Sequence, residues 1–297
     1  MNNVPIAVVI PTCVGRSVDK VIERIRACDP QPVEIIVHLD PAPAEKEQVA
    51  LAAEIRVLNS STRLGPGGAR HRCLLECTTP YAVSFDDDSY PTDTDFFGQV
   101  FELFSKYSEA AIFGANIWHR QEPPPLRSSR LILRPSYVGC GYAVRLEAYR
   151  EVRGHIPRPL AYGIEESDLS LQLFEAGWKI YEAGALRVFH DTDLKHHNSP
   201  GITSATIANI GLNAFLNYPV TGWGRGLVQV ANKIVYCIKK RRTDGIISGV
   251  LRLPADCYRY RGYRRPIQWR VVKEYLRFCR LNTEVESERK KVTYEDF

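Results

Sequence analysis

The segment that decides the fold is Ile6-Ala7-Val8-Val9-Ile10, a continuous run of apolar, mostly β-branched residues near the start of the chain. Such a run is typical of a strand that is buried on both faces of a parallel sheet, because every side chain then meets apolar surroundings. Pro11-Thr12 ends the run, and residues 17–28 repeat apolar side chains at helical spacing. The chain is therefore expected to open with a buried strand followed by an amphipathic helix.

The same alternation of strand and helix continues to residue 88. Apolar runs predict strands over residues 34–39, 55–58 and 81–85, and helical patterns predict helices over residues 45–53 and 69–76. This order predicts an α/β fold with a doubly wound, mostly parallel sheet. Ligands of such sheets bind at the carboxyl ends of the strands. We therefore expect Asp40 and residues 86–88 to line one crevice.

Three successive acids, Asp86, Asp87 and Asp88, follow the strand predicted over residues 81–85. Like charges this close repel one another unless a cation neutralises them. Mg²⁺ or Mn²⁺ suits this position, because both ions take carboxylate oxygens and keep coordination positions for phosphate. Alternate residues of an extended segment point the same way, which puts Asp86 and Asp88 on one face. The alternative is an acidic turn that caps the next element.

A second acidic group, Glu165, Glu166 and Asp168, stands where a helix is expected to begin. Acids are favoured at a helix N-terminus by the helix dipole, so capping alone explains one or two of them. A carboxylate that lies near a metal ion without binding it can instead act as a general base. This group is therefore the candidate source of a base.

Two weaker signals accompany the acids. His190 follows an apolar run over residues 185–189 and is a candidate third metal ligand, although a lone histidine is more often structural. The glycine-rich run over residues 65–68, which includes Gly67, leads into a helix that carries Arg70. Backbone N–H groups at such a helix start can bind anions. Neither signal identifies a function by itself.

In their order along the chain, these segments resemble glycosyltransferase family 2, which has the GT-A fold: a Rossmann-like, mostly parallel sheet flanked by helices. The resemblance covers roughly residues 4 to 195. It rests on VVIPTCVGR (8–16), EIIVHLD (34–40), RLGPGGAR (63–70), FDDDSYP (85–91) as the D-x-D motif, YVGCGYAVRLEAYREV (137–152) and AYGIEESDLSLQLFEAGWKIYEAGALRVFH (161–190). The D-x-D motif and the acidic segment stand at matching positions of the family pattern. Together they indicate the family much more specifically than either motif alone.

The resemblance implies a role for each matching residue. A nucleotide-sugar donor would contact Thr12, Arg16, Asp40, Gly67, Arg70, Asp86 and Asp87. Asp88, with Asp86 and His190, would hold Mg²⁺ or Mn²⁺, and Asp88 is the expected direct ligand. Glu166 stands at the position of the catalytic base, with Glu165 and Asp168 as its neighbours. The sequence differs from residues that are common in the family at Cys13-Val14-Gly15 and at Gln172. These differences affect the expected contacts with the nucleotide and the diphosphate more than the expected type of reaction.

The C-terminal quarter of the chain differs in charge from the rest. Between Arg225 and Arg280 there are 15 Lys/Arg and three acids, a local charge of +12, whereas the part before Pro219 is net acidic. We therefore divide the chain into a GT-A domain (1–218) and a basic amphipathic helical region (219–297). Apolar helical faces beside residues 239–242 and several tyrosines are typical of peripheral contact with an anionic membrane. The alternative is a solvated basic surface or a homodimer contact.

Several classes of protein are excluded or disfavoured. The chain shows no secretory signal and no apolar window of 18 or more residues, so a spanning helix is not expected. None of the eight cysteines forms a C-x-x-C pair, which favours reduced thiols over zinc or disulfides. No nucleic-acid-binding motif is present, so nucleic acid is not an expected partner. We expect a cytoplasmic protein with peripheral contact to the inner face of the plasma membrane.

These inferences combine into one hypothesis. The chain is expected to be an inverting, metal-dependent glycosyltransferase that moves a sugar from a nucleotide diphosphate donor to a hydroxyl of a saccharide or lipid-linked acceptor, in surface polysaccharide or glycan assembly. One alternative is a sugar-1-phosphate nucleotidyltransferase, which has a related sheet but leaves the acidic helix start unexplained. The other is a non-catalytic nucleotide-sugar-binding protein, against which the clustered acids argue.

Overall fold

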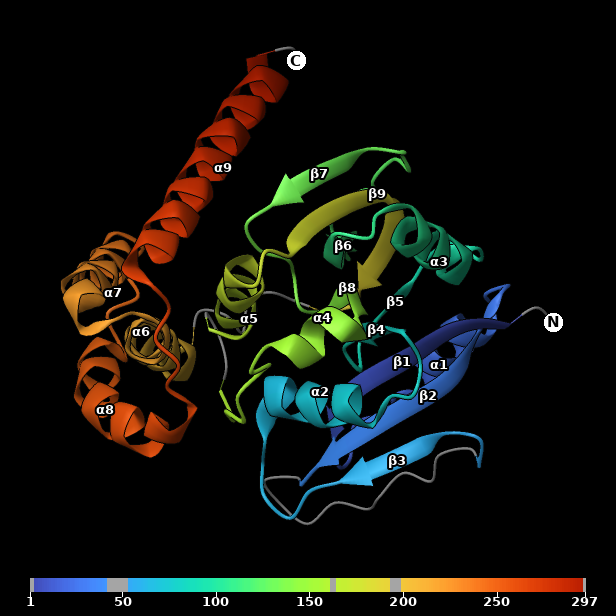
Figure 1. Ribbon diagram of the computed structural model, residues 1–297, viewed down its shortest axis with the longest axis horizontal. Helices are drawn as coiled ribbons and strands as arrows, with labels where there is room; N and C mark the ends of the chain where they lie inside the picture. Colours follow the sequence, from blue (N-terminus) through green and yellow to red (C-terminus); the bar gives the residue numbers. More distant parts are fainter. Residues whose placement is uncertain (1–2, 42–52, 161–163, 193–198, 296–297) are drawn as a thin grey trace.

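A computed structural model describes residues 3–41, 53–160, 164–192 and 199–295 of the chain. Helices cover both faces of a central sheet, and a separate layer of helices lies beside this sandwich (Figure 1). The strands are β1 (Asn3–Cys13), β2 (Gln31–Asp40), β3 (Arg56–Asn59), β4 (Tyr81–Phe85), β5 (Ser89–Pro91), β6 (Ala110–His119), β7 (Leu131–Arg134), β8 (Gly141–Arg145) and β9 (Lys179–His190). The helices are α1 (Asp19–Arg26), α2 (Gly65–Glu76), α3 (Phe96–Lys106), α4 (Leu146–Glu151), α5 (Glu165–Glu175), α6 (Pro200–Asn217), α7 (Trp223–Lys239), α8 (Ile246–Arg259) and α9 (Trp269–Glu295).

The described strands form one sheet in the order β3-β2-β1-β4-β8-β6-β9-β5, with β7 paired to β9. The first four strands of this order are mutually parallel, and β8 runs antiparallel between β4 and β6. These four are the strands predicted over residues 6–10, 34–39, 55–58 and 81–85, and the predicted α/β fold with its doubly wound sheet is confirmed. The helix predicted over residues 45–53 lies almost entirely outside the described residues, which resume at residue 53.

The two faces of β1 explain its uninterrupted apolar run. Ile6, Val8 and Ile10 point into one core, where α1 and α3 pack on the sheet. Ala7 and Val9 point into a second core on the opposite face, under α2, α4 and α5. Because successive side chains of a strand point to opposite faces, a strand between two helical layers needs an apolar residue at every position.

The sheet brings distant acids together at one edge. In the parallel register Cys13 lies beside Asp40, so β1 and β2 end at the same level, and β4 runs directly into residues 86–88. The short strand β5 then pairs antiparallel with the end of β9, which sets Ser89 opposite His190. The acids at the ends of β2 and β4 thus converge as predicted from the sequence, and the end of β9 joins them.

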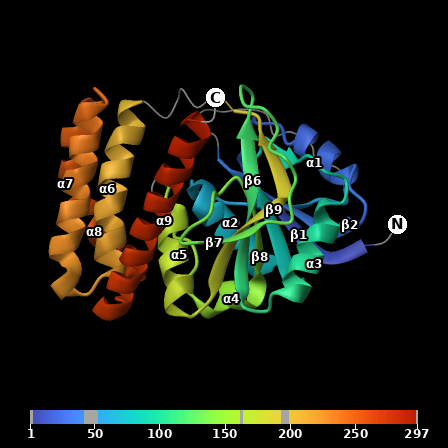
Figure 2. The same ribbon diagram turned by 90° about the horizontal axis from the view of Figure 1, so that it is seen from above.

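The C-terminal helices form a layer that packs against the sandwich (Figure 2). The predicted domain boundary between residues 218 and 219 lies between α6 and α7. Because α6 packs on α7 and α8, it belongs to the helical layer, and the boundary falls inside this layer. Arg158, in the loop after α4, makes a buried ion pair with Asp256 of α8 at 2.6 Å. Ile156 and Ile164 of the same loop join an apolar cluster with α6 and α8. The loop is therefore anchored by the helical layer. In the part of the chain that the structure describes, no helix has the length and apolar character needed to cross a bilayer.

Candidate active site

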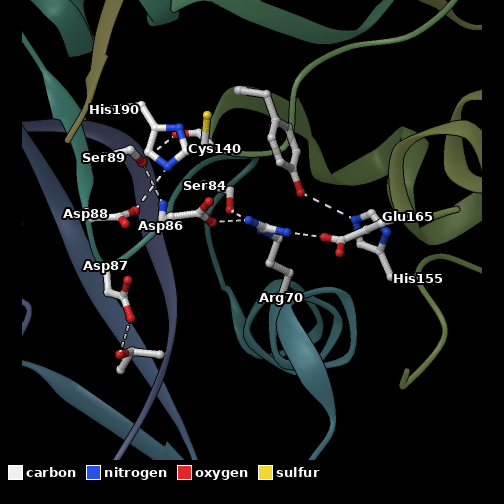
Figure 3. A network of polar contacts seen from close by, with 12 residues as sticks. Arg70, Ser84, Asp86, Asp87, Asp88, Ser89, Cys140, His155, Glu165 and His190 are labelled. Carbon is white, nitrogen blue, oxygen red and sulfur yellow. Dashed lines mark hydrogen bonds and ion pairs between the residues drawn. The ribbon is translucent and has the colours of Figure 1, made fainter. Parts of the chain in front are cut away.

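A cavity of about 750 Å³ opens at the carboxyl ends of β1, β2 and β4. Among the described residues, its lining contains six acids and three arginines, so this part of the site carries a surplus of negative charge. The acids are Asp40, Asp86, Asp87, Asp88, Glu165 and Glu166, and the arginines are Arg16, Arg63 and Arg70. Thr12, Cys140 and His190 also line it. Figure 3 shows how most of these side chains face one another.

Asp40 ties the end of β2 to the start of α2. Its carboxylate accepts hydrogen bonds from the backbone N–H groups of Leu64 (3.1 Å) and Gly65 (2.7 Å) and from the Ser60 hydroxyl (3.0 Å). Helix α2 begins at Gly65, so the glycine-rich run predicted as a loop is the first turn of the helix. Gly65 has a φ of +73°, and a Cβ there would lie 2.1 Å from the carbonyl oxygen of Arg158, so only glycine fits.

Arg70 lies at the centre of a buried polar network. Its guanidinium forms ion pairs with Asp86 and Glu165 and donates a hydrogen bond to the Ser84 hydroxyl (3.0 Å) (Figure 3). The side chain is almost fully buried, so these partners replace its hydration. Arg70 thereby connects Asp86, which follows β4, with Glu165, the first residue of α5, through its two terminal nitrogens.

The extended segment predicted over residues 86–88 is wrong, because Asp87 and Asp88 form a turn in which the Ser89 N–H donates to the Asp86 carbonyl (3.2 Å). The Asp87 side chain reaches the end of β1. It accepts a hydrogen bond from the Thr12 hydroxyl (2.7 Å) and pairs with Arg16 at 2.7 Å. Burial raises the pKa of Asp87 to about 6, although Thr12 and Arg16 oppose this shift. Thr12 and Arg16 thus both contact Asp87, and all three residues are assigned to the donor from the sequence.

Asp88 and His190 are adjacent, with the Asp88 Oδ1 3.2 Å from the His190 Nε2. Burial raises the pKa of Asp88, but the hydrogen bond and charge of His190 and the charge of Arg16 outweigh it, so the pKa lies below its usual value. The carboxylate is therefore ionised at neutral pH and available to a cation. Asp86 completes the predicted ligand set from the other side of the histidine (Figure 3).

The acids at the start of α5 separate into two environments. Glu165 and Glu166 line the cavity. Burial raises the pKa of both carboxyls, while the Arg70 charge lowers it. A Cβ at Gly139 would lie 2.7 Å from the Glu166 Oε1, so glycine at that position leaves room for the carboxylate.

Asp168 faces the other way. Its buried carboxylate pairs with Arg153 and accepts a hydrogen bond from the Asn217 side chain of α6 (2.7 Å). It does not line the cavity, and its contacts join α5 to the helical layer. Gly67 is also outside the lining: it is buried, and a Cβ there would meet the Glu165 side chain at 3.1 Å. The structure thus brings together every predicted site residue except Asp168 and Gly67.

The sequence reasoning missed Cys140 as a site residue. The ligand atoms of Asp86, Cys140 and His190 all lie within 4.8 Å of one another. Cys140 precedes β8 and stands between two glycines, and this spacing was the only signal that set it apart from the other cysteines. The carboxylates and the imidazole form a set that suits a divalent cation. Among the described residues of the lining, the charge of the three arginines does not balance that of the six acids.

Comparison with known proteins gives a family and a fold. Residues 7–161, more than half of the chain, match the family model described as glycosyl transferase family 2. No curated protein matches the chain. The match ends before the acidic start of α5 and before His190, so those residues lie outside the matched segment.

Three solved structures resemble the chain. GalNAc-T7 with UDP, GalNAc and Mn²⁺ has a TM-score of 0.55 at 13% identity, over 72% of this chain and 48% of that one. TarS residues 1–349 from S. aureus with UDP-GlcNAc has 0.53 at 12% identity, over 77% and 72%. The mannosyltransferase PcManGT from Pyrobaculum calidifontis with GDP-Man and Mn²⁺ has 0.51 at 11% identity, over 93% and 86%. The chain spans about half the length of the first of these. Likeness at such identities shows the fold, and the predicted GT-A fold is confirmed.

Replacing Arg70 by methionine should test the buried network. The variant leaves Glu165 and Glu166 buried without their cation, which should lower the free energy of unfolding by about 3–5 kcal/mol. Without the guanidinium, the pKa of each carboxyl rises further above its unfolded value. A carboxyl whose pKa is raised by folding stabilises the folded state at low pH, and this contribution is lost as pH rises through the folded pKa. The loss of unfolding free energy in the variant should therefore be larger at pH 8 than at pH 5. Chemical denaturation at both pH values measures it.

The matched control is Arg72→Met on the same helix, where the exposed side chain donates one hydrogen bond to the Asn59 carbonyl. This change should alter stability by about 0.5 kcal/mol or less. A small or pH-independent deficit in the Arg70 variant would contradict the network described above.

Proposed function

Since the chain belongs to glycosyl transferase family 2, we propose that it transfers a sugar from a nucleotide diphosphate donor to a hydroxyl of a saccharide or lipid-linked acceptor, with inversion at the anomeric carbon. The observation that carries the proposal is the convergence of the acids after β4, His190 and Glu166 in one cavity of about 750 Å³. Structures of the same fold hold UDP-GlcNAc, or GDP-Man with Mn²⁺, which supports a nucleotide-sugar donor and a divalent cation here.

The donor end of the cavity is built from β1, β2 and the start of α2. Thr12 and Arg16 stand at the end of β1 beside Asp40, with Arg63 and the first turn of α2 opposite. Arg16 is half exposed and already pairs with carboxylates, so its guanidinium can reach an anionic donor at the cavity mouth. Backbone N–H groups in the first turn of α2 add positive potential on the same side. These groups suit a nucleotide diphosphate.

The metal site consists of Asp88 and His190, with Asp86 nearby. A bound Mg²⁺ or Mn²⁺ would supply charge that stabilises the departing nucleotide diphosphate. In the proposed mechanism, Asp88 and the neutral imidazole of His190 would hold the cation. Arg16 balances part of the negative charge of Asp87 and Asp88.

Glu166 is the proposed base. Its carboxylate lines the cavity, whereas the Asp168 carboxylate is committed to Arg153 and Asn217. Burial raises the pKa of Glu166, which makes it a better proton acceptor than an exposed glutamate. The acceptor oxygen forms a bond to the anomeric carbon as the bond to the diphosphate oxygen breaks, and the hydroxyl proton passes to Glu166. Attack from the side opposite the leaving group inverts the anomeric configuration.

The helical layer presents an apolar surface to solvent. On α8, Ile247 and Leu251 are 75% and 73% exposed and lie one turn apart. On α7, Leu227, Val235 and Ile238 are exposed along one stripe. Lys239, Lys240 and Arg241, at and just after the end of α7, are exposed as well. Apolar stripes edged by basic residues support peripheral contact with an anionic membrane, and a homodimer contact is the alternative.

The metal site is tested by Asp88→Ala. A thermal-shift panel of UDP-, dTDP- and GDP-sugars with Mn²⁺ first identifies a stabilising donor. In the variant, stabilisation by that donor should lose its dependence on Mn²⁺, and both transfer and donor hydrolysis should fall to background, because the cation loses a charged ligand. Asp191→Ala, which removes only surface ion pairs to Lys20 and Arg120, should behave like the wild type. Near-normal activity of Asp88→Ala with metal chelated would show that the assignment is wrong.

Glu166→Gln tests the base. The amide keeps the shape of the side chain but accepts no proton, so transfer should fall about 10²-fold or more while donor affinity is retained. Single-turnover transfer and donor binding measure the two effects. Asp168→Asn is the comparison: its loss should appear as lower stability, because its carboxylate holds a buried ion pair. A larger defect in transfer from Asp168→Asn, at matched folding, would make Asp168 the base.

Membrane contact is tested by changing Lys239, Lys240 and Arg241 to serine. Arg242 is kept because its side chain hydrogen-bonds to the Thr203 hydroxyl. Each basic residue near an anionic bilayer contributes about 1 kcal/mol, so affinity for anionic vesicles should fall roughly a hundredfold. Transfer to a soluble acceptor should change little. Co-sedimentation at low and physiological salt measures the effect.

Two further variants accompany this experiment. Changing Ile247 and Leu251 to serine should weaken the binding that persists at high salt, because it removes the apolar contribution. Changing Arg24, Lys106 and Lys179 to serine removes the same charge from the sandwich and should leave vesicle binding nearly unchanged. If the wild type does not sediment with anionic vesicles, the surface is not a membrane contact, and sedimentation velocity would then test the homodimer.

A further inference from the structure

The sulfur of Cys140 faces the metal site. The ligand atoms of Asp86, Cys140 and His190 lie within 4.8 Å of one another, and all three residues line the cavity (Figure 3). Cys140 is 5% exposed, and no other residue in the described ranges hydrogen-bonds to its sulfur. A buried sulfur beside a carboxylate and an imidazole is a donor set that can bind a cation, which distinguishes Cys140 from the other seven cysteines of the chain.

The backbone around Cys140 is held in place from several directions. Strand β8 begins at the next residue, and its pairing with β4 sets Gly141 opposite Phe85, one residue before Asp86. The Ser89 hydroxyl donates to the Cys140 carbonyl and accepts from the backbone N–H of Asp86 (2.7 Å), so one side chain links both ligands. A Cβ at Gly141 would lie 3.0 Å from Val188 of β9, two residues before His190. The site is therefore positioned by β4, β8 and β9 together.

The chemistry of the three groups differs from that of an all-oxygen magnesium site. Carboxylate and water suit Mg²⁺ and Mn²⁺, imidazole suits zinc and related ions, and thiolate selects softer ions. Affinity for such a nitrogen and sulfur set rises from Mn²⁺ through Co²⁺ to Zn²⁺. A sulfur ligand thus changes which divalent cation the same pocket prefers.

We propose that Cys140 is a ligand of the metal site, together with Asp86 and His190, and that it shifts the preference of the site toward borderline-soft cations such as Co²⁺ and Zn²⁺. This proposal rests on the metal site of the proposed function and adds a ligand to it. The ion displaces the thiol proton to solvent and binds the thiolate, with no change of oxidation state. Asp88 lies beside this cluster, with its Oδ1 3.2 Å from the His190 Nε2.

The test uses Co²⁺ as a spectroscopic probe on the untagged, full-length protein, with and without UDP. A thiolate ligand gives a sulfur-to-cobalt charge-transfer band in the near ultraviolet, separate from the visible bands that any bound Co²⁺ shows. The wild type should show both. Cys140→Ser should lose the charge-transfer band, and its affinity for Zn²⁺ by calorimetry should fall about tenfold or more, while its affinity for Mn²⁺ changes much less.

Cys13→Ser is the matched control, because Cys13 lines the same cavity but lies outside the three-residue cluster. It should keep the band. Circular dichroism establishes that Cys140→Ser is folded, and ¹¹³Cd NMR of the wild type provides a measurement that needs no variant, since a thiolate moves the resonance downfield.

Three results would overturn the proposal. Bound Co²⁺ without a charge-transfer band in the wild type rules out a sulfur ligand, and a band that persists in Cys140→Ser rules out Cys140 as that ligand. Both results leave metal-dependent transfer standing. Absence of any divalent-cation binding, with or without UDP, rules out both the sulfur ligand and the metal site.

Discussion

The arrangement of the site depends on one buried cation, the Arg70 guanidinium, placed among carboxylates from two distant parts of the chain. Asp86 follows β4 and Glu165 opens α5, and each would be costly to bury alone. Arg70 pairs with both, and its Nε–H donates a hydrogen bond to the Ser84 hydroxyl. A rigid planar group with several fixed donors can hold two carboxylates at set positions, which a flexible lysine cannot do equally well.

The other acids after β4 have partners of their own at the cavity wall. Asp87 is held by Thr12 and Arg16, and Asp88 contacts His190 at the cavity wall. In the part of the lining that the structure describes, six acids face three arginines, so positive charge is in short supply there. A divalent cation with an anionic donor balances such a site better than either ligand alone, because the cation offsets the acids and the donor phosphates offset the cation. Cation and donor are therefore expected to bind together.

The helical layer contributes to the cavity through buried polar contacts. Arg158 pairs with Asp256 of α8, and its carbonyl packs against Gly65 at the start of α2. Pro159 and Leu160, which follow it, line the cavity. On the opposite surface α8 exposes Ile247 and Leu251. One helix thus connects an outward apolar surface with the loop that borders the donor pocket.

The sequence by itself determined the sheet and the edge at which ligands meet. A strand buried on two faces is mostly apolar, so β1, β2 and β4 can be identified from their apolar runs, although β2 contains His38 and β4 contains Ser84. Acids that follow such strands lie at their carboxyl ends. These are local consequences of side-chain alternation. The family and the GT-A fold follow from the same segments.

Only the tertiary structure decided which side chains share the cavity. Glu166 and Asp168 are two residues apart, about 200° around a helix, so one faces the cavity and the other faces α6, and the direction depends on how α5 packs. His190 lies beside Asp88 because β5 pairs with the end of β9, a contact between segments about 100 residues apart. The glycines on either side of Cys140 do not predict its neighbours, since its place beside Asp86 comes from the pairing of β8 with β4. The local sequence indicates which residues are buried and whether apolar residues repeat as in a helix or a strand. These contacts, in contrast, depend on pairing between distant segments.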